Sequence, residues 1–276
     1  MNRKRSFSTL TLVLCAALTA WAQTGAETYP KGARSIGMAN AHVTLTDAFG
    51  IFNNIGALGR LKSSQVIFGY DHRLGIQELT TLAAGAALVR DFGVFGLGVS
   101  HYGGDLFNQK NIGLGFSNTF GIASFGFKIN YFQTNIEGFG RNASPVLEFG
   151  GVAALGPDLY FGAHVYNFTR SKLSRAGSEY LPTVVKAGLS YLPADKLTIN
   201  VEAEKEILLL PQFKAGIEYN LVDRFWARSG IQTQPNNLFF GIGFKPNRYH
   251  IDYALGQNYR LGYTHHFSFS YLFYEE

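Results

Sequence analysis

The segment that decides the fold is the last one, His266-Phe267-Ser268-Phe269-Ser270-Tyr271-Leu272-Phe273, in which aromatic and mostly polar residues alternate. In an extended strand, successive side chains point to opposite faces of the sheet. The four aromatic side chains therefore share one face, which suits lipid, while the histidine and the serines share the other, which suits a wet lumen. A soluble two-sheet sandwich would alternate in the same way, so topology and targeting must separate the two folds.

Alternation recurs in fourteen segments, which predicts an all-β fold: a 14-stranded antiparallel transmembrane β-barrel over residues 64–276. Every second connection is a tight turn, as at Phe120-Gly121, whereas the intervening ones, such as 102–108, 136–145 and 169–180, are longer. Bacterial outer-membrane barrels sort their connections in this way, and a sandwich has no reason to do so. The expected strands are 64–74, 78–90, 93–103, 108–120, 121–135, 145–155, 157–168, 181–192, 195–206, 211–221, 223–233, 236–245, 247–256 and 261–273.

The first 22 residues have the pattern of a secretory signal peptide: three basic residues, an apolar run over 10–20 and the cleavage site Ala20-Trp21-Ala22. Cys15 follows Leu14 inside the apolar run, so we do not interpret it as a lipoprotein cysteine. It is the only cysteine, so the exported chain has no thiol for a disulfide or a thiolate metal site. The net charge of +5 owes three charges to this segment, so it gives little support for nucleic-acid binding, and we expect no nucleic-acid partner.

Residues 23–63 do not alternate, and we predict that they form a plug segment inside the lumen, because fourteen strands enclose more space than side chains fill. Most charges within the strands lie at inward-facing positions, since Lys or Arg facing lipid near the midplane costs about 2–4 kcal/mol. Their mixed signs predict pairing across strands and with Arg34 and Asp47 of the plug, rather than an ion filter of one dominant sign. This lumenal charge ladder is Lys186, Glu202, Glu204, Lys214, Glu218, Arg228 and Asp252.

The stretch from Gly32 to Leu58, GARSIGMANAHVTLTDAFGIFNNIGAL, resembles the opening of FadL-like and PorV/PorQ-like outer-membrane proteins. Asn40 stands where that pattern has a second glycine, and Asn54 replaces its proline. The resemblance implies a fourteen-stranded barrel with an N-terminal hatch. The style of the sequence also resembles that of Bacteroidota proteins, whose PorV-like members serve the type IX secretion system. The matching plug-motif residues are Gly32, Arg34, Gly37, Asp47, Asn53 and Gly56.

An enzyme is the least favoured reading. His250, Asp252, His266 and Ser268 share the inward parity of the last two strands and could be drawn as a Ser-His-Asp set, but polar residues lining a lumen explain them more simply. The pairs Gly96-x-Gly98 and Gly113-x-Gly115 are not followed by a helix, so we interpret them as room for the plug or for curvature rather than as a phosphate loop. No cofactor or metal is expected.

The loop 169–180 carries Arg170, Lys172 and Arg175, which we name as a candidate external contact loop for lipopolysaccharide phosphates or a protein partner. With about 15 residues per strand, where strands alone need about 9–11, little chain is left for capture loops. We therefore favour what the PorV-like resemblance implies, a non-enzymatic accessory or scaffold subunit of an outer-membrane secretion machine (type IX-like) or barrel-assembly machine. The alternative is a FadL-like channel or binding protein for a hydrophobic small molecule. Either reading places the chain among outer-membrane lipid, with both termini in the periplasm.

Overall fold

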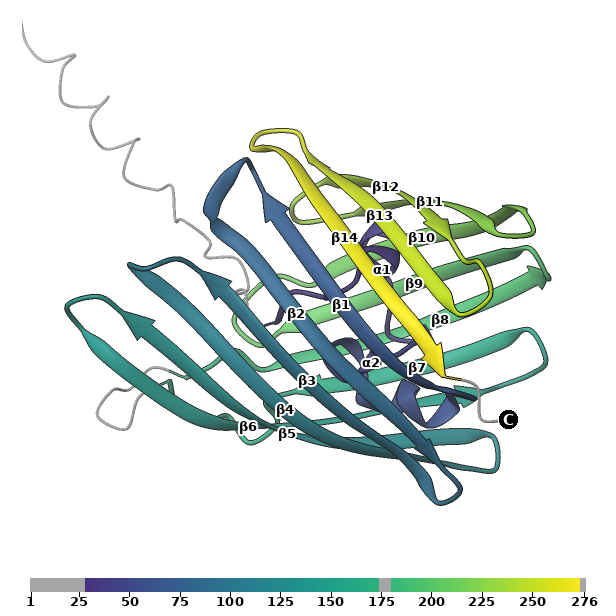
Figure 1. Ribbon diagram of the computed structural model, residues 1–276, viewed down its shortest axis with the longest axis horizontal. Helices are drawn as coiled ribbons and strands as arrows, with labels where there is room; N and C mark the ends of the chain where they lie inside the picture. The colour runs from purple at the N-terminus through teal and green to yellow at the C-terminus, as the bar shows by residue number, and fades with distance from the viewer. Residues whose placement is uncertain (1–27, 174–179, 274–276) are drawn as a thin grey trace, which may run out of the picture.

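The computed structural model describes residues 28–173 and 180–273, which form a closed antiparallel β-barrel (Figure 1). Each strand pairs with its neighbours in sequence, and β1 closes the barrel on β14. The 14-stranded barrel predicted from the sequence is thus confirmed. Its strands are β1 Ser64–Arg73, β2 Ile76–Arg90, β3 Gly93–Gly103, β4 Phe107–Phe120, β5 Ala123–Ile136, β6 Gly140–Ala154, β7 Leu159–Tyr166, β8 Val184–Ala194, β9 Leu197–Glu206, β10 Gln212–Val222, β11 Phe225–Gln232, β12 Asn237–Phe244, β13 Tyr249–Asn258 and β14 Gly262–Phe273.

The two faces of each strand meet different surroundings. On β14, Phe267 is 40% exposed on the outer surface, whereas Ser268 is 1% exposed inside the barrel. Large apolar side chains are exposed on the outside of every strand. Near one end they form aromatic contacts, with the ring centroids of Phe95 and Phe116 5.0 Å apart. An apolar exterior and a polar interior are what a barrel in a bilayer requires.

The connections sort by end, but less sharply than predicted. At the end where Ser64 pairs with Phe273, here called the turn end, the strands are joined by two-residue turns such as 91–92 and by the four-residue connections 155–158 and 245–248. At the opposite loop end, the predicted loops 102–108 and 136–145 are instead three-residue turns at 104–106 and 137–139, because β3 to β6 keep pairing as long hairpins (Figure 1). The long connection at this end is 167–183, between β7 and β8.

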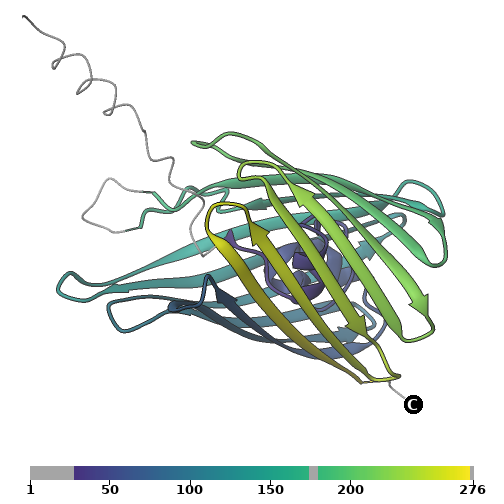
Figure 2. The ribbon, with the colours of Figure 1, turned by 90° about the horizontal axis from the view of Figure 1, so that it is seen from above.

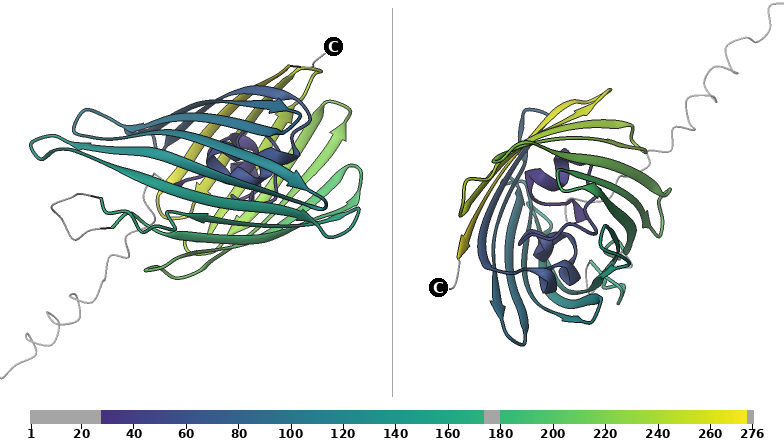
Figure 3. Two further views of the ribbon diagram at one scale, coloured as in Figure 1. Left: turned by 90° about the horizontal axis from the view of Figure 1, so that it is seen from below. Right: turned by 90° about the vertical axis from the view of Figure 1, so that its right-hand side faces the viewer.

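Residues 28–63 run through the inside of the barrel, as views from other sides show (Figures 2 and 3). They include α1 Ala33–Gly37, α2 Gly50–Asn53 and the 3-10 helix η2 Ile55–Arg60. No described helix has the length and apolar composition to cross a membrane. The predicted signal peptide, residues 23–27 of the predicted plug and residues 274–276 lie outside the described residues, so the placement of the termini stays a prediction.

Inward glycines let this inner segment approach the wall closely. A Cβ on Gly216 of β10 would lie 2.7 Å from the Met38 Cβ, and one on Gly162 of β7 would lie 2.6 Å from the Val43 carbonyl oxygen. Real Cβ atoms do not approach so closely, so only glycine fits at these places. Other strand glycines that face atoms of residues 28–63 are Gly69, Gly96, Gly98, Gly115, Gly126, Gly150, Gly188, Gly230 and Gly241.

Candidate functional site

An ion-pair network attaches α1 to strands β10, β11 and β13 of the barrel wall. Arg34 donates from Nε and Nη2 to the two Glu218 carboxylate oxygens, at 3.0 and 2.7 Å, and from Nη1 to Asp47 at 3.1 Å. Arg228 donates to the same Glu218 at 2.6 Å and to Asp252 at 2.7 Å. Burial opposes the charge on Arg34, but Glu218 and Asp47 together raise its pKa above the usual value. Glu218 therefore joins the inner segment to the barrel through two guanidinium groups.

A second network holds the turn that follows α1. The Glu202 carboxylate accepts the backbone N–H groups of His42 and Val43, both at 2.8 Å. Lys214 bridges Glu202 and Glu204, at 3.1 and 2.5 Å. Burial, with Lys186 and Lys214 nearby, holds the pKa of His42 well below its usual value, so its ring is neutral at pH 7. All seven residues of the lumenal charge ladder are buried inside the barrel: Lys186, Glu202, Glu204, Lys214, Glu218, Arg228 and Asp252.

A third buried cluster lies on β5 to β7, and sequence reasoning missed it. Glu148 accepts from Lys128 at 3.0 Å and Asn130 at 2.6 Å, and its other oxygen lies 3.1 Å from His164 Nε2. The Lys128 ammonium also lies 5.8 Å from the Phe52 ring of the inner segment. The alternation of these strands could have revealed the cluster, because every member occupies an inward-facing position.

The remaining motif residues shape the inner segment itself. Gly32 has a φ of 94° and faces the Phe49 ring, a conformation and a space that suit only glycine. Gly37 packs against the Gly241 backbone. Asn53 accepts the Lys31 N–H at 2.9 Å and donates to the Lys31 carbonyl at 2.9 Å, which ties α2 to the start of the segment.

Gly56 yields a prediction about how tightly the inner segment is seated. A Cβ at this position would lie 2.5 Å from the Gly151 Cα, and a strand backbone cannot move aside. We expect Gly56→Ala to lower the free energy of unfolding by about 1–3 kcal/mol, as overpacking does. The control is Gly156→Ala in a turn, where nothing lies within 4 Å. Denaturant titration in detergent measures both, and equal stabilities would contradict the close fit.

The Ser-His-Asp set considered from the sequence is not assembled. Ser268 accepts the Ala33 N–H at 3.0 Å, and Asp252 pairs with Arg228. His266 instead contacts Asp71 across the β1–β14 pair, with Nδ1 2.7 Å from a carboxylate oxygen. Among the described residues, no three His, Cys, Asp or Glu side chains gather as metal ligands would.

The described residues of the candidate external contact loop lie at the loop end, between β7 and β8. The guanidinium carbon of Arg170 and the Nζ of Lys172 lie 5.4 and 5.8 Å from the centre of the Tyr180 ring. Arg175 falls outside the described residues. Leu173 and Leu181 of this connection pack in an apolar cluster. The cluster consists of Phe132, Val146, Tyr166, Leu181 and Val184, with Leu173 packed against it.

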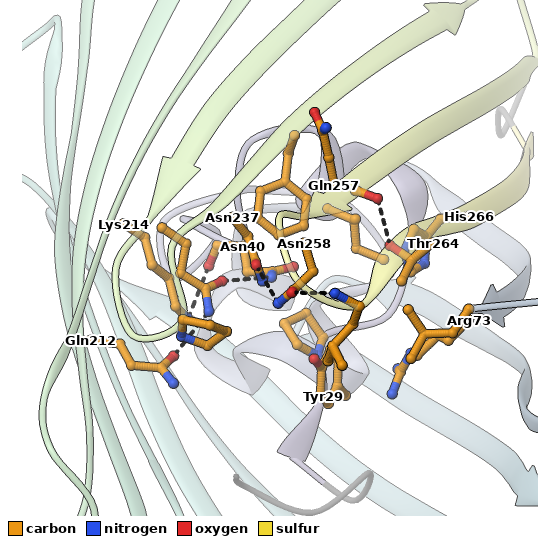
Figure 4. Close-up of a pocket in the computed structure, with 18 of the residues that line it drawn as sticks. Tyr29, Asn40, Arg73, Gln212, Lys214, Asn237, Gln257, Asn258, Thr264 and His266 are labelled. Atoms are coloured by element: carbon orange, nitrogen blue, oxygen red, sulfur yellow. Dashed lines mark hydrogen bonds between the residues drawn. The ribbon is translucent and has the colours of Figure 1, made fainter.

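The other side of the loop end contains a cavity of about 320 Å³ (Figure 4). It lies between the start of the inner segment, at Tyr29, and the hairpin residues Leu74 and Leu261. Its volume is in the range of small-molecule sites. The apolar lining is Tyr29, Pro30, Ile36, Leu74, Leu79, Tyr102, Pro235, Phe239 and Leu261, and polar groups such as Lys214, Gln232, Asn237 and Thr264 complete the wall.

Arg73 also lines this cavity, and some of its N–H groups are not used in hydrogen bonds with the described residues. It is 8% exposed, and its guanidinium carbon lies 3.6 Å from the centre of the Tyr29 ring. Its Nε and Nη2 are buried without a hydrogen-bond partner among the described residues. A buried donor without a partner is costly, so such a group in a cavity marks a place where a ligand acceptor fits.

A second hollow of about 760 Å³ opens at the turn end, where Leu45, Arg60 and Tyr160 contribute to its wall. Arg34 also lines it, whereas Ile36 and Asn40 line the cavity at the loop end. The two spaces therefore lie on opposite sides of the chain around α1.

A closed fourteen-stranded barrel that encloses its own N-terminal segment belongs structurally with the outer-membrane barrels. No protein-family model and no curated protein matches the sequence. Solved structures do. A FadL homologue from Pseudomonas aeruginosa is 14% identical with a TM-score of 0.62, over 88% of this chain and 98% of that chain.

Two further matches are forms of TodX. The Pseudomonas putida toluene transporter TodX is 11% identical with a TM-score of 0.59, over 81% of this chain and 91% of that chain. The deltaS2 mutant of TodX, described as a monoaromatic hydrocarbon channel, is 12% identical with a TM-score of 0.67, over 90% and 99%. At these identities the likeness is one of fold.

Proposed function

We propose that this protein is an outer-membrane channel or binding protein for hydrophobic small molecules. The cavity at the loop end carries this proposal, because it combines an apolar lining with the buried Arg73, whose Nε and Nη2 have no hydrogen-bond partner in the described part of the chain. The fold of a FadL homologue and of TodX supports it. In this proposal the loop end faces outside, residues 1–22 are the signal peptide, and the apolar exterior lies in the outer membrane.

The lining favours a ligand with an apolar body and an acidic end. The body would lie against Ile36, Tyr102 and Phe239, and the acidic group would meet the Arg73 guanidinium. A carboxylate accepts two parallel hydrogen bonds from a guanidinium, and such charge-assisted bonds are roughly twice as strong as neutral ones.

Passage through the barrel requires the inner segment to move. The cavity and the hollow at the turn end are separated by the chain around α1, and Glu218 and Glu202 anchor that chain. The proposed transport cycle therefore includes a rearrangement of residues 28–47 while η2 stays against the wall formed by β4 to β6.

The accessory-subunit reading stays a prediction from the sequence. Large apolar side chains are exposed on every strand, so the exterior distinguishes no single strand as a protein contact. Arg170 and Lys172 stay candidates for an external contact.

Arg73→Gln tests the proposed ligand. We expect binding of a long-chain carboxylate to weaken by roughly 10- to 150-fold, because charge-assisted hydrogen bonds contribute about 1.5–3 kcal/mol. Binding of a neutral aromatic hydrocarbon should change less than about twofold, because it uses apolar contacts alone. Calorimetric titration of the purified protein in detergent measures both, with Arg60→Gln, which removes a cation stacked on Tyr160, as the matched control. If wild type binds neither probe, the proposal is wrong.

A further inference from the structure

A groove on the outer wall crosses β1 to β4 below the loop end, on the opposite side of the sheet from the lumen. It has a volume of about 530 Å³. Its walls include Phe68, Leu82, Val99 and Ile112, each 40–51% exposed. Ala84 pairs with Phe68 on one side and Val99 on the other, so a small side chain between larger ones creates the depression.

Two polar side chains stand at the end of the groove nearer the loop end. His101 and Lys110 face each other across β3 and β4, one outward position beyond the Val99–Ile112 pair. Lys110 is exposed, and no carboxylate among the described residues pairs with it. His101 Nδ1 is buried without a hydrogen-bond partner. The nearest outward carboxylate on β2, Glu78, lies four residues beyond Leu82, toward the hairpin.

The height of this pair matches the membrane boundary. Lys110 precedes the outward Phe120 at the turn end by ten residues of β4, which corresponds to about 26 Å at a rise of about 3.4 Å per residue and a tilt of about 40°. The apolar band of an outer-membrane barrel is about 25 Å tall. Beyond Lys110, the next outward positions on β4, β5 and β6 are Asn108, Asn135 and Arg141, which are polar.

We propose that this groove is a specific site for a phosphate-bearing membrane lipid. One acyl chain lies over Ala84 between Phe68 and Val99, and the lipid phosphate meets the Lys110 ammonium and a ring N–H of His101. The charges are complementary, and the ammonium is a strong donor to phosphate. The site is separate from the lumen and does not depend on the proposed channel function.

The test compares two lipids on the full chain purified in detergent. Native mass spectrometry counts the molecules retained after incubation with bisphosphoryl lipid A or with its dephosphorylated form. We expect the wild type to retain the phosphorylated lipid about tenfold better. The double variant Lys110→Gln with His101→Gln should lose that preference, while Lys196→Gln, in the exposed turn between β8 and β9, should keep it.

Ala84→Leu tests the groove separately from the charge. The change fills the depression on an apolar outer face that tolerates leucine, so the barrel should still fold and should retain both lipids less well. Equal retention of the two lipids by the wild type, or an unchanged preference in the double variant, would overturn the proposal. Recovery of the wild type as a dimer that Ala84→Leu dissociates would assign the groove to a second copy and would also overturn it.

Discussion

Replacing Glu218 with alanine is expected to make the barrel conduct ions and to destabilise it. The substitution removes the carboxylate that Arg34 and Arg228 share, at 2.6–3.0 Å. Each guanidinium then keeps one carboxylate, Asp47 or Asp252, and the two neighbouring cations repel each other. Breaking a buried ion pair by removing one partner costs about 3–5 kcal/mol. If α1 bears that cost, the equilibrium between the seated and released inner segment shifts by roughly 150- to 5,000-fold.

Single-channel recording in planar bilayers measures this release, because an emptied barrel of fourteen strands encloses an open interior. Wild type should stay closed for most of the record, and Glu218→Ala should open often. Glu137→Ala, in an exposed hairpin turn, is the matched control and should behave as wild type. A variant that unfolds more easily yet never conducts would show that the ion pairs stabilise the wall without holding the inner segment.

The barrel could be predicted because its evidence is local. The alternation of Phe267, Ser268 and Phe269 indicates the face on which each side chain lies. A strand with clear alternation also helps to interpret the strand beside it. The lengths of the hairpins could not be predicted as well. The segment 140–144 has little alternation in polarity, yet it continues β6 because its backbone pairs with β5 from Ile136 to Phe132.

The contents of the lumen were predictable only in kind. Alternation placed Glu218 and Lys214 inside, and the mixed signs of the inward charges predicted a lumenal partner for Arg34. Which partner it has depends on the path of residues 28–63, which do not alternate and so carry no parity. The cavity at the loop end depends on the same path, since Tyr29 and Ile36 form part of its lining. Arg73 was therefore missed: its position on β1 indicates only that it faces inward.

The groove on the outer wall illustrates the opposite case. Its residues alternate regularly, and Lys110 could have been recognised from parity as a charge on the lipid side. Its meaning needed the register, because only the pairing of Lys110 with His101, and of Ala84 with Phe68 and Val99, brings the polar end and the depression together.

The second large effect is expected at Glu148. Glu148→Ala should lower the free energy of unfolding by about 3–5 kcal/mol, because it leaves Lys128, 2% exposed, as a buried charge without its carboxylate. His164 and Asn130 lose the same acceptor. Denaturant titration in detergent, followed by Trp226 fluorescence, measures the change, and the exposed Glu137→Gln is the control for removing a carboxylate.

The double variant Lys128→Met with Glu148→Leu separates the cost of an orphaned charge from the contribution of the pair. Replacing a buried pair by apolar groups of similar size is often neutral or stabilising by about 1–4 kcal/mol, since neither charge then has to leave water. We expect this variant to unfold near the wild-type midpoint. If it is as unstable as Glu148→Ala, the cluster contributes through its contacts with His164, Asn130 and Phe52, and the lumen depends on a complete polar network rather than on balanced charge.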